Sequence, residues 1–179
     1  MSSATIDSVV YPMARRGGLF LVIIGAALIV AIAFSGAALV NYAVFYVGAG
    51  VAVLSLFLSG RLSLGTPTRL QIAALAAAIA LEVALFVVMG HTLPRGTSEH
   101  VRWLWVLMIV GVHFVPMAVS FGPIFALLGG ACIANAALGL VLPTTPYELF
   151  GLVDGALKVV VGAWALRPPA RAEGSPRPR

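Results

Sequence analysis

Four ionisable residues interrupt long apolar segments of this sequence: Glu82, His113, Asp154 and Lys158. Within a bilayer an ionisable side chain is costly unless it is paired, so such residues are candidates for a functional site. A carboxyl, an imidazole and an amine are also the groups that move protons in transporters and in acid–base enzymes. We therefore take these four residues as a candidate proton-transfer (catalytic) cluster.

Helical rise places these residues at a common depth. At about 1.5 Å per residue, each lies about 14–20 Å from the same end of its predicted helix. Asn135 falls at a similar depth, near the middle of a hydrocarbon core about 30 Å thick. Each helix should turn its polar residue inward, because lipid cannot satisfy it. Asn135 is accordingly the candidate substrate-binding residue, and a hydrogen bond between helices is its alternative role.

The ionisable residues also have structural interpretations. Asp154 and Lys158 are spaced i, i+4 with the acid first, which favours an ion pair within one helix. His113 precedes Pro116 by three residues and could simply hydrogen-bond to another helix. Glu82 has no cation on its own helix, and only Lys158 or His113 could pair with it. Glu82 is therefore the strongest candidate for proton exchange.

Composition indicates that lipid is the solvent of this chain. Of its 179 residues, 61% are hydrophobic and only 9% are charged, whereas soluble domains carry roughly 25% charged residues. The net charge of +5 comes from arginines at the ends of apolar segments and in the C-terminal region, not from a basic stripe interleaved with aromatics. We expect no nucleic-acid partner. The bilayer is the expected partner, and the sequence allows a homo-oligomer.

Residues 17–166 are expected to form an all-α bundle of about six transmembrane helices. A bilayer core needs about 20 residues, so two apolar runs are each long enough for two spans. We place their breaks near Ser35-Gly36 and at Phe121-Gly122-Pro123. The predicted spans are 18–35, 41–59, 70–89, 103–120, 123–142 and 147–166. Residues 1–16 form a short N-terminal segment, and the Pro- and Arg-rich residues 167–179 a tail expected to be disordered.

The basic residues give this arrangement an orientation. Arg95 and Arg102 would lie outside and Lys158 within the membrane, whereas the other eight basic residues would lie in the cytoplasm. That asymmetry is typical of a bacterial inner-membrane protein with both termini in the cytoplasm. Aromatic residues near the outer boundary are expected to form an interfacial belt: Tyr42, Trp103, Trp105 and Tyr147.

The first span has a second interpretation. Arg15-Arg16, the apolar run that follows and Ala31-Ile32-Ala33 resemble a cleavable signal peptide. Cleavage would leave five spans without changing the orientation of the rest. The apolar character continues directly into another span, which favours an uncleaved helix.

The two halves of the chain also show a weak internal symmetry. Each consists of an apolar hairpin followed by a single span that bears an acid. Gly25 and Gly36 recur as Gly111 and Gly122, both at an offset of 86 residues. Repeats of three spans would have inverted topology, an arrangement found in many transporters.

Several motifs are absent from the sequence. It contains no phosphate-binding glycine loop with lysine, no HExxH and no GxSxG, which disfavours ATP-driven transport, zinc proteolysis and lipase chemistry. Cys132 is the only cysteine, so the chain has no CxxC motif. His91, Glu99 and His100 make a poor metal site in a loop that we expect to be solvated. No cofactor or metal is expected.

Three stretches carry a resemblance to known sequences: His113-Phe114 through Phe121-Gly122-Pro123, then Cys132-Ile133-Ala134-Asn135, then Asp154-Gly155-Ala156-Leu157-Lys158. This pattern resembles a family of small uncharacterised bacterial multipass membrane proteins and covers at least the C-terminal third of the chain. Since that family has no assigned activity, the resemblance implies no function.

Two functions of different classes therefore remain open. The first is proton-linked transport or permeation of a small solute, with proton exchange near the midplane. The second is an intramembrane acid–base enzyme acting on a lipid-soluble, isoprenoid-like substrate. A non-catalytic subunit that only binds a membrane partner is a third interpretation. The sequence alone does not decide whether the protein is an enzyme.

Overall fold

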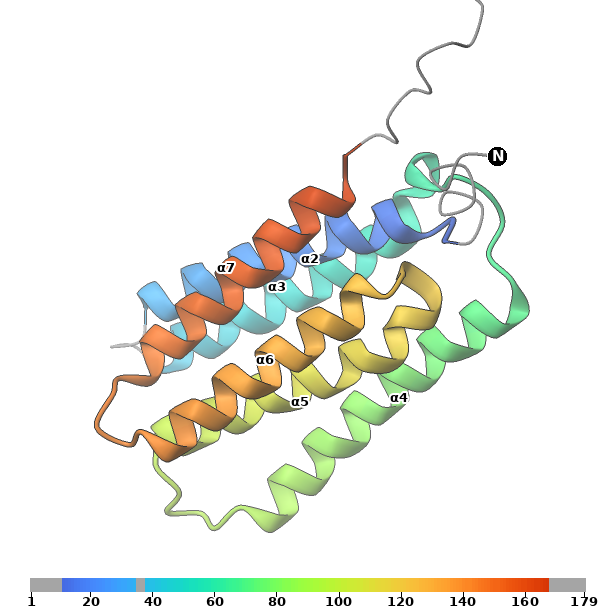
Figure 1. Ribbon diagram of the computed structural model, residues 1–179. Coiled ribbons are helices and arrows are strands. Elements are labelled where there is room, and N and C mark those ends of the chain that lie inside the picture. Colours follow the sequence, from blue (N-terminus) through green and yellow to red (C-terminus); the bar gives the residue numbers. More distant parts are fainter. Residues whose placement is uncertain (1–10, 35–37, 168–179) are drawn as a thin grey trace, which may run out of the picture.

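The computed structural model describes residues 11–34 and 38–167, and their regular structure is entirely helical (Figure 1). The elements are α2 (Ala14–Ala33), α3 (Ala38–Leu58), the short 3-10 helix η1 (Gly60–Leu62), α4 (Arg69–Thr92), α5 (Glu99–Phe121), α6 (Ile124–Val141) and α7 (Tyr147–Ala165). No strand occurs in these residues. The all-α fold class is confirmed.

Five of the described helices, α2 to α6, are long and apolar enough to cross a membrane. Helix α7 has 19 residues but carries Glu148, Asp154 and Lys158. Each of the six predicted spans overlaps one of the helices α2 to α7. That these helices cross a bilayer stays a prediction. The predicted break at Ser35-Gly36 and all but the first residue of the predicted tail lie outside the described residues.

Local sequence explains where several helices begin and end. Thr68 and Gln71 form a capping box at the start of α4, in which each side chain accepts a hydrogen bond from the other's backbone N–H (3.0 and 3.2 Å). The Ser98 hydroxyl accepts from the N–H of Val101 at the start of α5. Gly122, with a φ of 106°, ends α5 in a conformation that L side chains rarely adopt, and Pro123 then starts α6.

The helices form two three-helix clusters (Figure 1). In the first, α2 packs extensively against α3 and α7; in the second, α5 packs extensively against α6 and α4. The third helix of each half of the chain thus packs on the hairpin of the other half. The two clusters meet mainly through α6 and α7, while α3 and α4 make no extensive contact with each other.

Glycines bring the principal helix pairs close together. A Cβ at Gly25 of α2 would lie 2.7 Å from the carbonyl oxygen of Gly155 on α7. A Cβ at Gly129 of α6 would lie 2.6 Å from the carbonyl oxygen of Gly111 on α5. Small residues at such positions are typical of helix interfaces in membranes, where close backbone approach provides the packing energy.

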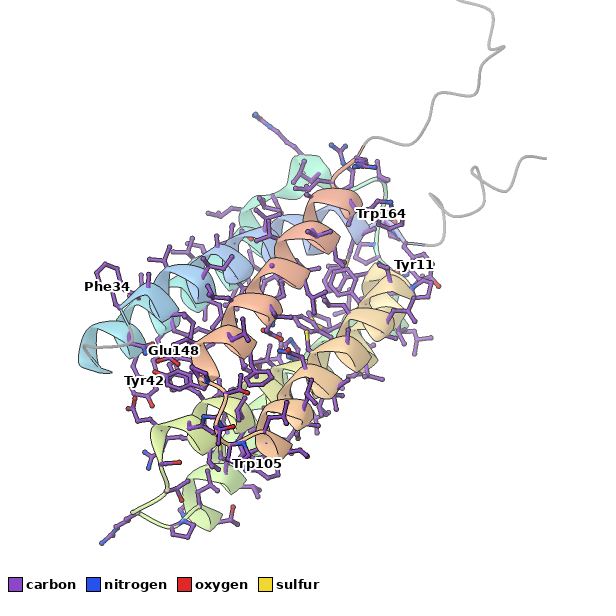
Figure 2. The ribbon with its side chains drawn as sticks, turned by 60° about the vertical axis from the view of Figure 1, so that its left-hand side comes forward. Tyr11, Phe34, Tyr42, Trp105, Glu148 and Trp164 are labelled. Carbon is purple, nitrogen blue, oxygen red and sulfur yellow. The ribbon has the colours of Figure 1, made fainter. Side chains whose placement is uncertain are left out.

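The arginines of the described residues all lie at the two ends of the bundle. Because successive helices run antiparallel, one end carries the described residues Arg15, Arg16, Arg61, Arg69 and Arg167. The other end carries Arg95 and Arg102, and we call it the Arg95/Arg102 end. Tyr42, Trp105 and Glu148 lie toward that end, and Tyr11 and Trp164 toward the opposite one (Figure 2). Which end faces the cytoplasm stays a prediction.

The expected aromatic belt is wrong for Trp103. Its side chain is only 1% exposed and lies between the rings of Tyr42 and Tyr147, at centroid distances of 5.1 and 6.3 Å. The rings come from three different helices, α3, α5 and α7, so hydropathy along the chain could not reveal the stack. Trp105, 38% exposed, does lie on the surface.

Candidate functional site

Glu82 and His113 lie side by side where α4 packs against α5. Glu82 Oε1 is 3.6 Å from His113 Nδ1. The His113 side chain is only 4% exposed, whereas 25% of the Glu82 side chain is exposed. Of the two partners that the sequence left open for Glu82, the structure brings His113 into contact.

This pair lines an apolar pocket of about 220 Å³ between the two clusters. Helices α2 and α3 form one wall, which includes Phe20 and Phe45, and α4 and α5 form the other. Apart from Glu82 and His113, the lining side chains are aliphatic or aromatic. A mainly apolar hollow with a few polar groups is the usual form of a small-molecule site.

The pocket reaches the outer surface of the bundle between α3 and α4. Three of its lining residues are well exposed: Tyr46 is 63%, Val53 40% and Val83 57% exposed. This side of the bundle is also where the two helices lack extensive contact. If the helices cross a bilayer, the pocket opens sideways toward lipid.

Asp154 and Lys158 form a second pair, on α7. Their carboxylate and ammonium form an i, i+4 ion pair and their side chains are 0% and 1% exposed. The Lys158 ammonium also lies 3.9 Å from the Cys132 sulfur on α6. The structure thus shows the intrahelical pairing that the spacing of the two residues predicts.

Phe114 of α5 links the two pairs. Its ring centroid is 4.5 Å from that of His113 and 5.5 Å from the Lys158 ammonium. All four predicted residues lie where the two clusters meet. The Lys158 ammonium lies over the face of the Phe114 ring, and this cation–π contact stabilises its positive charge.

Asn135 lies apart from this group. Its side-chain amide donates a hydrogen bond to the Phe150 carbonyl oxygen (2.8 Å), joining α6 to α7. It is not among the residues that line the pocket beside Glu82. This placement fits the interhelical role that was the alternative for Asn135.

The polar loop expected from His91 to Arg102 is shorter in the structure, because α4 extends to Thr92 and α5 begins at Glu99. His91 lies in the last turn of α4, and Glu99 and His100 lie in the first turn of α5. The His100 ring is 3.3 Å from the Gly139 carbonyl oxygen and packs edge-on against Tyr147. His100 is therefore partly buried by this packing, whereas His91 and Glu99 are exposed, as expected. Across residues 11–34 and 38–167 no three His, Cys, Asp or Glu side chains gather as a metal site would require.

Comparison with known families covers almost the whole chain. A profile described as a family of unknown function (DUF6609) matches residues 5–171. The chain belongs to this family. No curated protein and no solved structure matches it. The expectation of an uncharacterised family is confirmed, and the function of this DUF6609 member has to be inferred from its site.

Sequence reasoning did not identify two residues of the site in this DUF6609 protein. Phe114 contacts His113 and Lys158, and Cys132 contacts Lys158. One of nine phenylalanines in an apolar chain carries no distinguishing signal. The position of Phe114 next to His113 gives a hint, but its contact with α7 depends on helix packing.

Proposed function

We propose that this protein is a membrane-embedded, proton-linked transporter of a small, largely apolar solute. The observation that carries this proposal is the Glu82–His113 pair on the wall of an apolar pocket between two helix clusters. Glu82 and His113 exchange the proton, and the apolar wall binds the solute.

The size of the pocket limits the solute. Drug-sized ligands occupy pockets of roughly 300–1,000 Å³, and this pocket measures about 220 Å³. It fits a small molecule, or one end of a longer apolar chain whose remainder lies in lipid. A polar solute would leave its hydrogen-bonding groups unsatisfied against the aliphatic and aromatic lining.

Proton exchange follows from the pairing of a carboxyl with an imidazole. In one state the proton resides on His113, so that imidazolium faces carboxylate; in the other it resides on Glu82 and both groups are neutral. The 3.6 Å separation requires only a small shift to become a direct hydrogen bond. A solute that favours one of these states couples its own binding to the position of the proton.

The helix arrangement supports transport over simple binding. In many transporters the site lies at the interface of inverted repeats, and one bundle rocks against the other. Here the pocket wall is divided between α2 and α3 of one cluster and α4 and α5 of the other. Rocking would therefore change the pocket while leaving the packing inside each cluster intact.

Reconstitution into liposomes that contain a pH-sensitive dye tests the proposal. Small apolar weak acids and bases are added outside, and proton movement that depends on the solute is recorded. Glu82→Gln keeps the shape of the side chain but cannot titrate, so we expect at least a tenfold loss of flux. Glu82→Asp, one methylene shorter, should keep part of it.

The matched control is Glu148→Gln, the same substitution in the first turn of α7, remote from the pocket. It should retain wild-type flux. Full flux in a folded Glu82→Gln protein would contradict the role of Glu82. Absence of flux from the wild type with every solute would contradict transport itself.

The opening toward lipid supports a second candidate, the intramembrane acid–base enzyme. Exposure of Tyr46, Val53 and Val83 would let an isoprenoid-like substrate enter sideways. The Glu82 carboxyl would then donate a proton to a carbon–carbon double bond and His113 would remove one from the resulting cation, giving an isomer or a ring. Product formation without solute-dependent proton flux would favour this candidate over transport.

A further inference from the structure

Two more hollows lie along the seam between α4 and α5, and neither shares a lining residue with the Glu82 pocket. One, of about 200 Å³, is apolar and includes Leu85, Val88 and Ile109. The other, also about 200 Å³, lies at the Arg95/Arg102 end. The two hollows adjoin, because Met89 and Leu93 line both, and together we call them the α4–α5 groove.

Two arginines line the end of this groove. Arg95 is exposed in the connection between α4 and α5, and Arg102 is half-buried in the first turns of α5. Within the described part of the chain neither guanidinium forms an ion pair with a carboxylate. Two like charges at one hollow repel each other unless an anion lies between them. Guanidinium groups bind phosphate oxygens with two parallel hydrogen bonds, which makes phosphate a well-matched anion.

The groove also has the dimensions of a lipid site. Ile109 lies seven residues beyond Arg102 on α5, a distance of about 10 Å along the helix. The groove thus passes from a cationic end to an apolar floor over the distance that separates a phosphate from the first part of an acyl chain. Trp105, 38% exposed, lies on the wall between them, where an amphipathic ring suits the membrane interface.

We propose that the α4–α5 groove binds a phospholipid. Its phosphate lies against Arg95 and Arg102, and one acyl chain follows the apolar part of the groove past Val88. This site is separate from the Glu82 pocket, to which α4 contributes other residues, Glu82, Val83 and Phe86. A negative result in the transport experiment would therefore not contradict the lipid site.

Native mass spectrometry of the full chain in detergent tests this proposal, with phosphatidylglycerol as the probe. Arg95→Gln/Arg102→Gln should weaken lipid binding at least tenfold, because it removes both phosphate contacts. Arg61→Gln/Arg69→Gln makes the same charge change at the opposite end and should bind as the wild type does. Equal binding by the Arg95/Arg102 variant, or an equal loss in the control, would overturn the proposal.

Two further measurements separate a lipid from a free anion. Glycerol phosphate, which has the anion without chains, should not displace phosphatidylglycerol at millimolar concentration. Val88→Trp places a large side chain in the apolar part of the groove at a residue that is 55% exposed, so folding should be unaffected. It should weaken phosphatidylglycerol binding severalfold. Displacement by glycerol phosphate together with unchanged binding by Val88→Trp would identify a simple anion site and overturn the lipid proposal.

Discussion

At the scale of single residues, Asp154 and Lys158 show how a largely apolar helix carries two charges without exposing them. Both side chains are buried, and neither lies at the end of α7. Removing an isolated charge from water is very costly, but a close ion pair with other favourable contacts offsets much of that cost. The Phe114 ring and the Cys132 sulfur supply such contacts to Lys158.

Removal of one member of this pair should therefore cost more than removal of both. Lys158→Leu leaves Asp154 buried and unpaired, which should lower the free energy of unfolding by about 3–5 kcal/mol. Asp154→Leu/Lys158→Leu replaces the pair by apolar side chains and should be nearly neutral. Thermal unfolding in detergent measures both variants. A double variant no more stable than Lys158→Leu would show that the two charges do not compensate each other.

Glu82 differs from Asp154 in its surroundings. Asp154 forms an ion pair with Lys158 four residues away on its own helix, whereas Glu82 faces an imidazole that can hold or release a proton. Only Glu82 is also partly exposed, at the wall of a pocket. A carboxyl that can meet a ligand and whose partner titrates is better placed to exchange protons than one locked in a buried salt bridge.

The protonation of Glu82 can be tested without knowing the solute. Dicyclohexylcarbodiimide is apolar and reacts with protonated carboxyl groups. We expect it to modify Glu82, which lines a pocket open to the surface, and to leave the buried Asp154 unmodified. Modification should decrease as pH rises, because only the protonated form reacts. Peptide mass spectrometry locates the label. If the Glu82→Gln protein took up as much label as the wild-type protein, the label would not be on Glu82 and the prediction would be contradicted.

At the scale of the elements, the helices follow from the sequence but their packing does not. Uninterrupted apolar runs and the break at Phe121-Gly122-Pro123 predict where helices begin and end. Helix α4, by contrast, exposes apolar side chains on most of its surface, for example Leu70, Ile79 and Val87. An element that is apolar all round gives no pattern from which to choose its neighbour, so the packing of α4 on α5 could not be predicted.

The same reasoning applies to the candidate site. Depth along each helix placed Glu82, His113, Asp154 and Lys158 in one band, because helical rise is fixed. Depth does not determine rotation about the helix axis or the order of helices around the bundle. It therefore also included Asn135, which the structure places in contact with the Phe150 backbone. The contact of Phe114 with Lys158 depends on both of these unknowns.

Close packing of α2 on α7 should depend on Gly25. Its added Cβ would lie 2.7 Å from the Gly155 carbonyl oxygen and 2.9 Å from the Lys158 Cβ, so the helices would have to separate. Overpacking of this kind costs about 1–3 kcal/mol. We expect Gly25→Ala to lower the Tm by several degrees. The matched control is Gly130→Ala on α6, where nothing lies within 4 Å of the added Cβ.

Gly130→Ala should leave the Tm unchanged or raise it, because alanine favours a helix over glycine by about 1 kcal/mol. A Gly25→Ala protein as stable as the Gly130→Ala protein would show that α2 and α7 tolerate a wider separation. The close glycine contact would then not be what fixes the position of Lys158.

At the scale of the whole molecule, the exchange of third helices between the halves makes each half incomplete. Helix α4 packs on the α5–α6 hairpin, and α7 packs on the α2–α3 hairpin. If one half were removed, the other would lose the main packing partner of its third helix. In this arrangement α2 and α5 run in opposite directions (Figure 1), as inverted repeats require, but Gly25 packs on α7 whereas Gly111 packs on α6, and Gly36 lies outside the described residues. The internal duplication stays a prediction.

The orientation of the molecule in the membrane is the remaining property that one experiment can decide. Five described arginines lie at one end of the bundle and two at the other, and the richer end is expected in the cytoplasm. Single cysteines at Thr66 and Gly96, both exposed and at opposite ends, report on this in a Cys132→Ala background.

A maleimide that cannot cross the membrane should label Gly96→Cys in intact cells and Thr66→Cys only in inverted vesicles. The physical reason is that the two positions flank α4, whose 24 residues span about 36 Å and exceed a hydrocarbon core of about 30 Å. Labelling of both positions from the same side would show that α4 does not cross the bilayer. Glu82 would then lie outside a lipid environment, and neither the transport nor the lipid-site proposal would stand.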